Sequence, residues 1–337
     1  MSGKREISQF EVIMQLRLPL IILVTYAHSY GDVEDGFSLL TSDWNAYEFL
    51  KLLVSQTLVK VAVPVFFIIS GYLFFVNVKE WNVHVYHEKM MRRVKTLLLP
   101  YLVWNLLMAI KLKTFSWSLF VDPADMPLWF LRDLMVVSLL TPIMYIGVKR
   151  LGYGVLIVLL PVYLTGIWAI QPGLNPLGLC FFTLGAFLGI RKKNLLEVMR
   201  RFEVPAYVLS LLLGITMMLA YNSVFFQVLV LCFRLTGGVA VFCIAQRGLP
   251  SIRSLHCPQH WPSLLSDAAY FIYLAHYVLF MSFIDEAFFS LFGTSTASLC
   301  AHYLLCPLIK AVIFIFAYVL SRFTMSVLLH KKNAFNC

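Results

Sequence analysis

The sequence predicts an all-α protein, a polytopic integral-membrane helical bundle of about ten transmembrane helices. Hydrophobic residues make up 60% of the 337 residues and charged residues only 13%. The mean hydropathy is +0.81. Soluble domains carry about 25% charged residues, so this composition excludes a water-soluble globular protein. Apolar runs long enough to cross a membrane recur along the whole chain. This arrangement is evidence beyond the apolar composition itself.

Ten apolar segments are candidates for crossing a membrane. They cover residues 11–30, 52–77, 96–112, 128–148, 152–170, 174–190, 204–221, 223–245, 264–284 and 299–329. We found no internal repeat and expect one transmembrane domain over residues 1–337, with no appended soluble domain. The first run has no small-residue cleavage site after it, so we expect a retained signal-anchor.

The charged residues between these segments predict how the chain is oriented. Basic residues gather in alternate connections, at Lys4/Arg5, 79–95, Lys149/Arg150, 191–201, Arg247/Arg253 and Lys331/Lys332. The positive-inside rule makes these connections cytoplasmic, with both termini inside, in a multi-pass protein of the inner (plasma) membrane. The net charge of +10 is thereby explained by loops that contact the lipid bilayer, and we expect no nucleic-acid partner.

Arg17 and His28 lie within the first apolar segment, where charged and titratable side chains are costly. Eleven steps of about 100° bring both side chains to nearly the same face of a helix, roughly 16 Å apart along it. Alternatively, Arg17 reaches the headgroups and His28 lies at the interface. The functional interpretation is a neutral imidazole that takes a proton from a hydroxyl and a guanidinium that grips phosphate or a carbonyl oxygen.

A series of segments resembles the membrane acyltransferase-3 family. Arg17-x10-His28 resembles its signature, and the other segments are VPVFFIISGYLFF, RRVKTLLLPYLVWN, PLWFLRDLMVVSLLTP, FFTLGAFLG and FIYLAHYVL, in the family's order. The resemblance implies a ten-helix enzyme that moves acyl groups, commonly acetyl from acetyl-CoA, to hydroxyls of cell-surface sugars. It also implies that His28 is the catalytic base and that Arg17 positions or polarises the donor.

Two positions depart from the family's pattern. Many members carry an acidic residue three positions before the arginine, where this chain has Met14. Many also carry an RRxxR run, which here reads Arg92-Arg93-Val94-Lys95-Thr96. We expect Arg92, Arg93 and Lys95 to hold the phosphates of acyl-CoA at the cytoplasmic side, because arginine binds phosphate with two hydrogen bonds. The alternative role of this run is to set topology and contact headgroups.

Three further residues are candidates for binding or supporting the substrate: Trp129, Arg132 and His276. Trp129 either anchors at the interface or stacks on an acceptor sugar. Arg132 and Asp133 are neighbours that project about 100° apart on a helix, so they need not pair. His276 lies in the ninth segment, where an intramembrane histidine has a functional or a hydrogen-bonding role. We interpret Ser70, Gly71 and Tyr72 as a place of close helix approach.

No metal site and no permanently bound cofactor are predicted. His256 and Cys257 are metal-ligating types, but a proline follows and no second ligand pair is present. The seven cysteines lie mostly inside apolar runs and support no disulfide framework. The predicted function is therefore an integral-membrane O-acyltransferase, with acyl-CoA as co-substrate and a carbohydrate acceptor. Alternatives are a transporter or flippase for a glycan or lipid-linked precursor, and a structural membrane protein. The oligomeric state is left open, with a homodimer as one option.

Overall fold

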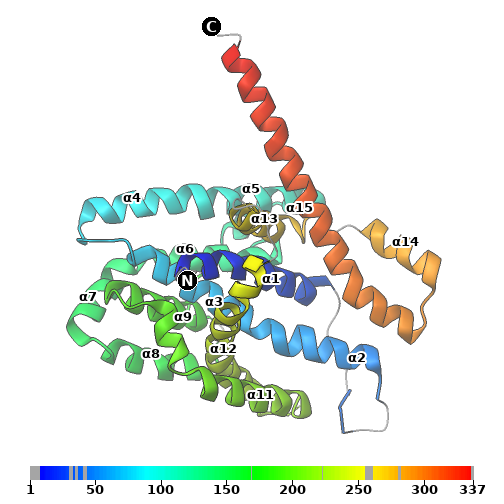
Figure 1. The fold of residues 1–337 in the computed structure, drawn as a ribbon, viewed down its shortest axis with the longest axis horizontal. Helices are drawn as coiled ribbons and strands as arrows, with labels where there is room; N and C mark the ends of the chain where they lie inside the picture. The colour runs from blue at the N-terminus through cyan, green and yellow to red at the C-terminus, as the bar shows by residue number, and fades with distance from the viewer. Residues whose placement is uncertain are drawn as a thin grey trace.

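The helical membrane bundle is confirmed by a computed structural model. It describes residues 8–29, 33–34, 37–40, 44–167, 169–221, 223–254, 261–279 and 282–334. Within these ranges, an isolated bridge between Gln171 and Leu174 is the one β-type pairing, and the rest of the regular structure is helical (Figure 1). Lys4, Arg5 and the His256–His260 run lie outside the described residues.

Five helices are long and apolar enough to cross a membrane. They are α1 (Gln9–Ser29), the joined helix of α2 (Ala46–Lys51) and α3 (Ala62–Phe75), the joined helix of α4 (Val83–Arg93) and α5 (Leu99–Leu112), part of α12 (Phe226–Ser254), and part of α15 (Thr296–Ala334). A sixth candidate is the pair α6 (Trp129–Leu139) and α7 (Thr141–Leu151), bent by 57° where Pro142 starts the second helix.

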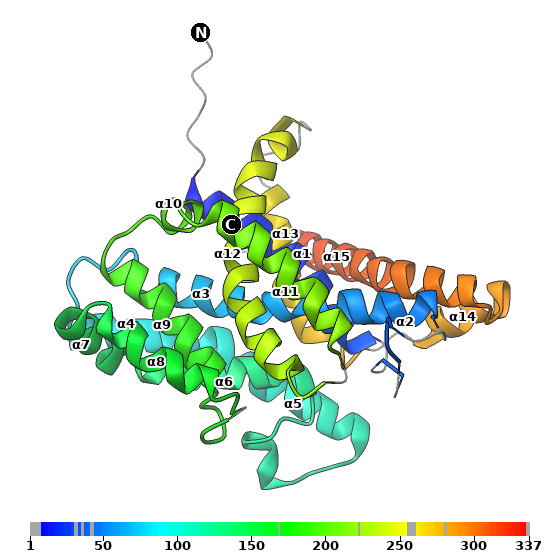
Figure 2. The same ribbon diagram turned by 90° about the horizontal axis from the view of Figure 1, so that it is seen from below.

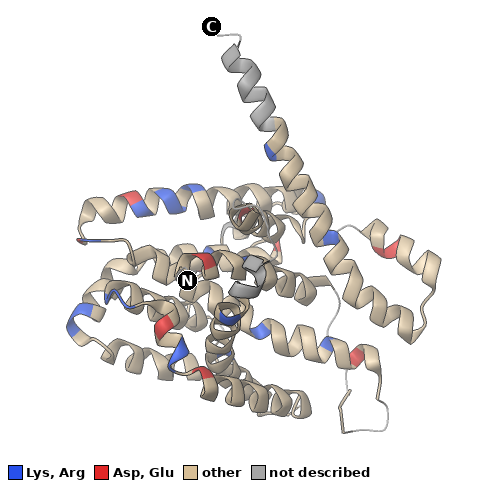
Figure 3. Ribbon diagram, in the orientation of Figure 1, with Lys and Arg blue, Asp and Glu red and all other residues tan. Residues whose placement is uncertain are grey.

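The remaining predicted segments hold shorter apolar helices. These are α8 (Gly154–Leu164), α9 (Pro176–Ile190), α11 (Glu203–Leu219) and α13 (Trp261–Ala275), while α10 (Leu195–Arg200) and α14 (Ser282–Phe292) lie between segments or at their ends. Each of the ten predicted segments thus contains helix, and the count of ten membrane crossings stays a prediction. Figure 3 shows most ribbons without charge over long stretches, with Lys and Arg marked on α4 and at the turn from α7 to α8.

Two of the long helices contain a wider turn of π-helix. Leu52–Thr57 precedes a short 3₁₀ turn, Leu58–Val61, before α3, and Val94–Leu98 joins α4 to α5. A π turn inserts an extra residue and rotates the side chains that follow it relative to those before it. The second π turn therefore changes the direction of the basic run at residues 92–95 relative to α5.

Helix α9 lies against α3 at the centre of the bundle, and both views show the two side by side (Figures 1 and 2). Nearly every residue of α9 is buried, as expected for a helix that is apolar on all faces. Glycines allow the two backbones to meet: a Cβ on Gly185 would lie 2.0 Å from the Ile68 oxygen, and one on Gly71 would lie 2.0 Å from the Phe182 oxygen. Small residues at such crossings allow close approach between membrane helices, which confirms the interpretation of Gly71.

Helix α1 packs against α13, and it also contacts α12 and α15. Tyr26 at its last turns donates a 2.6 Å hydrogen bond to the Leu304 carbonyl of α15. The buried face of α1 includes Val12, Leu16 and Leu20. This arrangement leaves Arg17 and His28 facing the space between α1, α3 and α13.

We predict that Gly185→Val lowers the thermal unfolding midpoint of the purified protein. The new side chain meets the α3 backbone, and overpacking costs about 1–3 kcal/mol, roughly 2–12 °C in the midpoint. Gly238→Ala in α12 is the matched control, because its Cβ would lie 3.8 Å from the nearest Val65 carbon, an ordinary contact. Equal midpoints for both variants would contradict the close approach of α3 and α9.

Candidate active site

A cavity of about 700 Å³ lies between α1, α3, the π turn Val94–Leu98, α6 and α13. Its walls are mostly apolar, and its polar lining gathers in a few places. The lining includes Arg17, His28, Ser70, Arg93, Thr96, Trp129, Ser266, Asp267, Tyr270 and Tyr273. Ligand sites have this size and this combination of apolar walls with few polar groups.

Arg17 projects into this cavity from the middle of α1. Its Nη1 donates a 3.0 Å hydrogen bond to the Ser266 hydroxyl of α13. Asp267 is next along α13 but its carboxylate pairs with Arg322 at 3.3 Å, where both side chains are more than half exposed. Arg17 is thus held by a neutral hydroxyl.

Arg93 lines the same cavity from the end of α4. Its Nη2 donates to the Ser70 hydroxyl at 3.0 Å, and its guanidinium lies 5.5 Å from the centre of the Phe74 ring. Within the part of the chain that the structure describes, neither Arg93 nor Arg17 forms an ion pair. Two such guanidiniums facing one cavity make it suited to an anionic ligand.

The cavity is open on the side of Arg93, where several lining residues are exposed. Thr96, Asp267 and Tyr270 line the Arg93 end and are exposed. His28 lies at the other end, in the last turn of α1, together with Trp129 at the start of α6. Its ring centre is 5.5 Å from that of His276 and 6.1 Å from that of Tyr277.

The structure therefore brings together five of the predicted site residues. Arg17, His28, Arg93 and Trp129 line the cavity, and His276 lies directly behind His28. The eleven-residue spacing predicts that Arg17 and His28 share one face of a helix, and both line the cavity. The distance of roughly 16 Å that eleven residues of helix imply is spanned by one continuous cavity.

Three predicted site residues lie elsewhere. Arg92 and Lys95 are exposed and do not line the cavity, because only one side chain of the basic run can face α3. Arg132 also lies outside it: its side chain pairs with Asp133 at 2.9 Å and donates to the Val121 carbonyl. The sequence leaves the pairing of Arg132 with Asp133 open, and the structure shows the pair because the long guanidinium side chain folds back over its neighbour.

Several lining residues carried no signal in the sequence. Ser70, Thr96 and Ser266 are common residue types, and no spacing marks them. Ser70 was interpreted only as part of a packing site. Its position one residue before Gly71 could have indicated a second role, since a residue beside a helix crossing faces an adjacent element.

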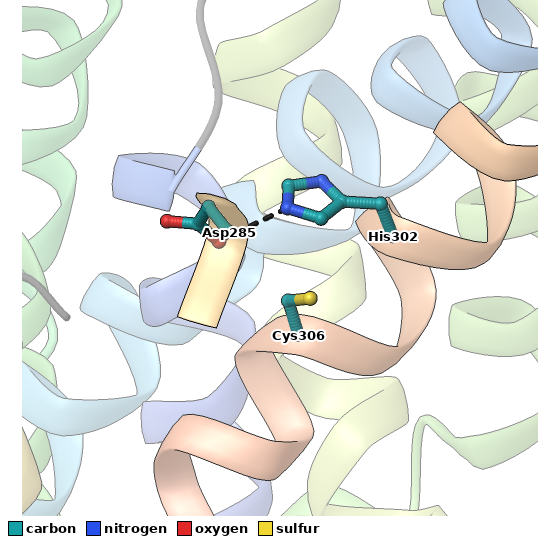
Figure 4. Close-up of side chains that lie close together, drawn as sticks. All are labelled: Asp285, His302 and Cys306. Atoms are coloured by element: carbon teal, nitrogen blue, oxygen red, sulfur yellow. Dashed lines mark hydrogen bonds and ion pairs between the residues drawn. The ribbon is translucent and has the colours of Figure 1, made fainter. Parts of the chain in front are cut away.

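Asp285, His302 and Cys306 form a second group of metal-ligating types, with ligand atoms within 4.8 Å of one another (Figure 4). His302 lies 3.0 Å from one Asp285 oxygen, and Lys310 pairs with the other at 2.7 Å. An ammonium on the same carboxylate disfavours a divalent cation there, because the like charges repel. This group fits best as an ionic connection between α14 and α15.

Comparisons with known proteins show the family of the chain. The family model of the acyltransferase domain matches residues 13–331. The succinoglycan biosynthesis protein ExoH of Rhizobium meliloti (strain 1021) is 24% identical over 220 residues, which cover 56% of each of the two chains. The aligned part thus spans little more than half the length of that relative. No solved structure gives a significant match.

Arg132 has a carboxylate partner and Arg93 has none in the described structure, so we predict that replacing each arginine changes protein stability by different amounts. Arg132→Met leaves the Asp133 carboxylate, 1% exposed, buried without its cation, at a cost of about 3–5 kcal/mol. Arg93→Met removes a guanidinium that has no carboxylate partner in the described structure, so the thermal midpoint should stay within about 2 °C of the wild type, the shift expected from under 1 kcal/mol. Differential scanning fluorimetry compares the two variants, and an equal drop in both would contradict a ligand-binding assignment for Arg93.

Proposed function

The chain belongs to the acyltransferase-3 family, and we propose that this membrane enzyme transfers an acyl group from acyl-CoA to a hydroxyl of a cell-surface polysaccharide. The observation that carries the proposal is one cavity lined by His28 and by two guanidiniums, Arg17 and Arg93, that form no ion pair in the described structure. A donor with phosphates at one end and a thioester at the other matches this arrangement.

We assign the Arg93 end of the cavity to the cytoplasm. Arg93 lies within the basic segment 79–95, which the positive-inside rule makes cytoplasmic, and acyl-CoA is made in that compartment. Arg93 then binds the phosphates of the donor, with Arg92 and Lys95 attracting them at the exposed rim. Cytoplasmic termini and the inner membrane belong to the same proposal.

The acyl arm then extends along α1 toward His28. Arg17, about midway, contacts the amide carbonyls of the pantetheine arm or the approach to the thioester, while Ser266 holds the guanidinium in place. This arrangement explains why Arg17 need not touch the reacting carbonyl: it lies roughly 16 Å along the helix from His28. Its role is to position the donor.

His28 acts as the general base in this scheme. It takes the proton of the acceptor hydroxyl as that oxygen attacks the thioester carbonyl, and it returns the proton to the departing sulfur. The C–O bond forms, the C–S bond breaks and the products are an ester and CoASH. Trp129 at the same end offers a ring face for the sugar.

The acceptor class is inferred from the family and from the relative's name. That name states a part in succinoglycan biosynthesis, and a sugar hydroxyl is a group that a histidine base can deprotonate. We propose acetyl as the acyl group, since it is the acyl group that the family most often transfers.

His28→Ala should lower the rate of CoA release by about 10²–10⁴-fold, because a placed base contributes this much. The assay uses purified protein, acetyl-CoA and de-esterified surface polysaccharide. His87→Ala is the control, because His87 is exposed on α4 and does not line the cavity. Unchanged CoA release by His28→Ala would overturn the assignment of the base.

Arg93→Gln should weaken acyl-CoA binding by about tenfold or more, since a charge-assisted hydrogen bond is worth about 1.5–3 kcal/mol. Arg92→Gln, at the exposed neighbouring residue, should weaken acyl-CoA binding by less than about fivefold, as for a rim charge worth under 1 kcal/mol. Calorimetric titration with acetyl-CoA in detergent measures both constants. A larger effect of Arg92→Gln than of Arg93→Gln would contradict donor binding inside the cavity.

A further inference from the structure

A second, much smaller cavity also borders His28. It has a volume of about 20 Å³ and is lined by Thr25, His28, Ser29, His276 and Lys310, with Leu279 and apolar residues of α15. This volume accommodates one water molecule. His28 is part of the lining of both cavities, so its ring adjoins both the proposed substrate space and His276.

The hydrogen bonds of His276 fix which of its nitrogens carries the proton. Its Nδ1 lies 2.8 Å from the Tyr273 carbonyl oxygen and 3.2 Å from the Ile272 carbonyl oxygen. Carbonyl oxygens only accept, so Nδ1 must be the donor. A neutral ring then has a lone pair at Nε2, which is an acceptor.

The Nε2 of His276 is buried and has no hydrogen-bond partner in the described structure. Buried acceptors in folded proteins normally receive a proton donor. The His28 ring, centred 5.5 Å away, can supply an N–H directly or through the one water that the small cavity accommodates. Lys310 is a poor alternative for orienting His28, because its ammonium pairs with Asp285 and can only donate.

We propose that His276 is a positioning residue that fixes the tautomer of His28. A neutral imidazole has one N–H, and when that N–H points to His276 Nε2 the lone pair is left on the nitrogen that faces the large cavity. This is the state that a general base requires, and the imidazolium formed during the reaction keeps the same contact. The inference rests on the proposed role of His28.

The alternative role, a path that carries protons away from His28, is not required by the chemistry. The acceptor hydroxyl loses one proton and the thiolate of CoA gains one, so the transfer neither releases nor consumes protons. A fixed acceptor behind the base is sufficient. His28 returns its proton to sulfur within the large cavity.

The test compares His276→Gln with His276→Met, which have similar size. The Gln side chain keeps an acceptor oxygen near the position of Nε2, and Met does not. We expect His276→Met to lower kcat for acyl transfer by about 10- to 100-fold, as for the loss of a residue that orients a histidine, with KM for acetyl-CoA within about twofold. His276→Gln should retain most of kcat, as should Ser29→Ala, which alters the same cavity.

Nitrogen-15 NMR of histidine-labelled protein provides the second readout, with the His28 signals assigned by their loss in His28→Gln. We expect one tautomer of His28 in the wild type and in His276→Gln, and a mixture in His276→Met. Equal behaviour of the Gln and Met variants, with His28 unchanged, would overturn the inference. A wild type with a single tautomer but no acyl transfer would instead contradict the proposed function, so the two failures are distinguishable.

Discussion

The close approach of α3 and α9 is the constraint on which the rest of the structure depends. Gly71 and Gly185 allow the two backbones to touch, which fixes the distance of α3 from α9 and its rotation about its own axis. Ser70, the residue before Gly71, then faces the cavity and accepts a hydrogen bond from the guanidinium of Arg93. The apolar wall formed by Phe66, Ile69 and Leu73 has the same origin. Helix packing on one face of α3 thus determines the shape and the polar contacts of the site on the other.

Two kinds of partner hold cations in the described structure, carboxylates and neutral groups. Arg132 pairs with Asp133 near the start of α6, and Lys310 of α15 pairs with Asp285 of α14. Arg17 and Arg93 are held by serine hydroxyls and face a cavity. Burying a cation beside a neutral partner is unfavourable without an anion, and proteins retain such groups where a ligand supplies the charge. Arg17 and Arg93 differ from other cations with neutral partners because both line the same cavity, which makes that cavity the candidate ligand site.

The sequence predicted the bundle and the central pair, because both depend on local rules. Composition and periodicity specify membrane helices, and the eleven-residue spacing places Arg17 and His28 on one face of α1. The basic run did not reveal that Arg93 alone enters the cavity, because that depends on the π turn at Val94–Leu98 and on the position of α3. Nor did adjacency reveal the Arg132–Asp133 pair, since side-chain rotamers decide it. Ser70 and Ser266 become recognisable only when distant helices meet.

The central claim is that one cavity holds the whole donor, from phosphates at Arg93 to thioester at His28. A cryo-electron microscopy structure with a non-hydrolysable acetyl-CoA analogue tests it most directly. We expect phosphate density beside Arg93, the pantetheine arm along α1 past Arg17, and the thioester carbonyl carbon near the His28 ring. The space between that carbon and the ring should accommodate an acceptor oxygen about 3–3.5 Å from the carbon. Density for the analogue outside this cavity, or with its thioester away from His28, would contradict it.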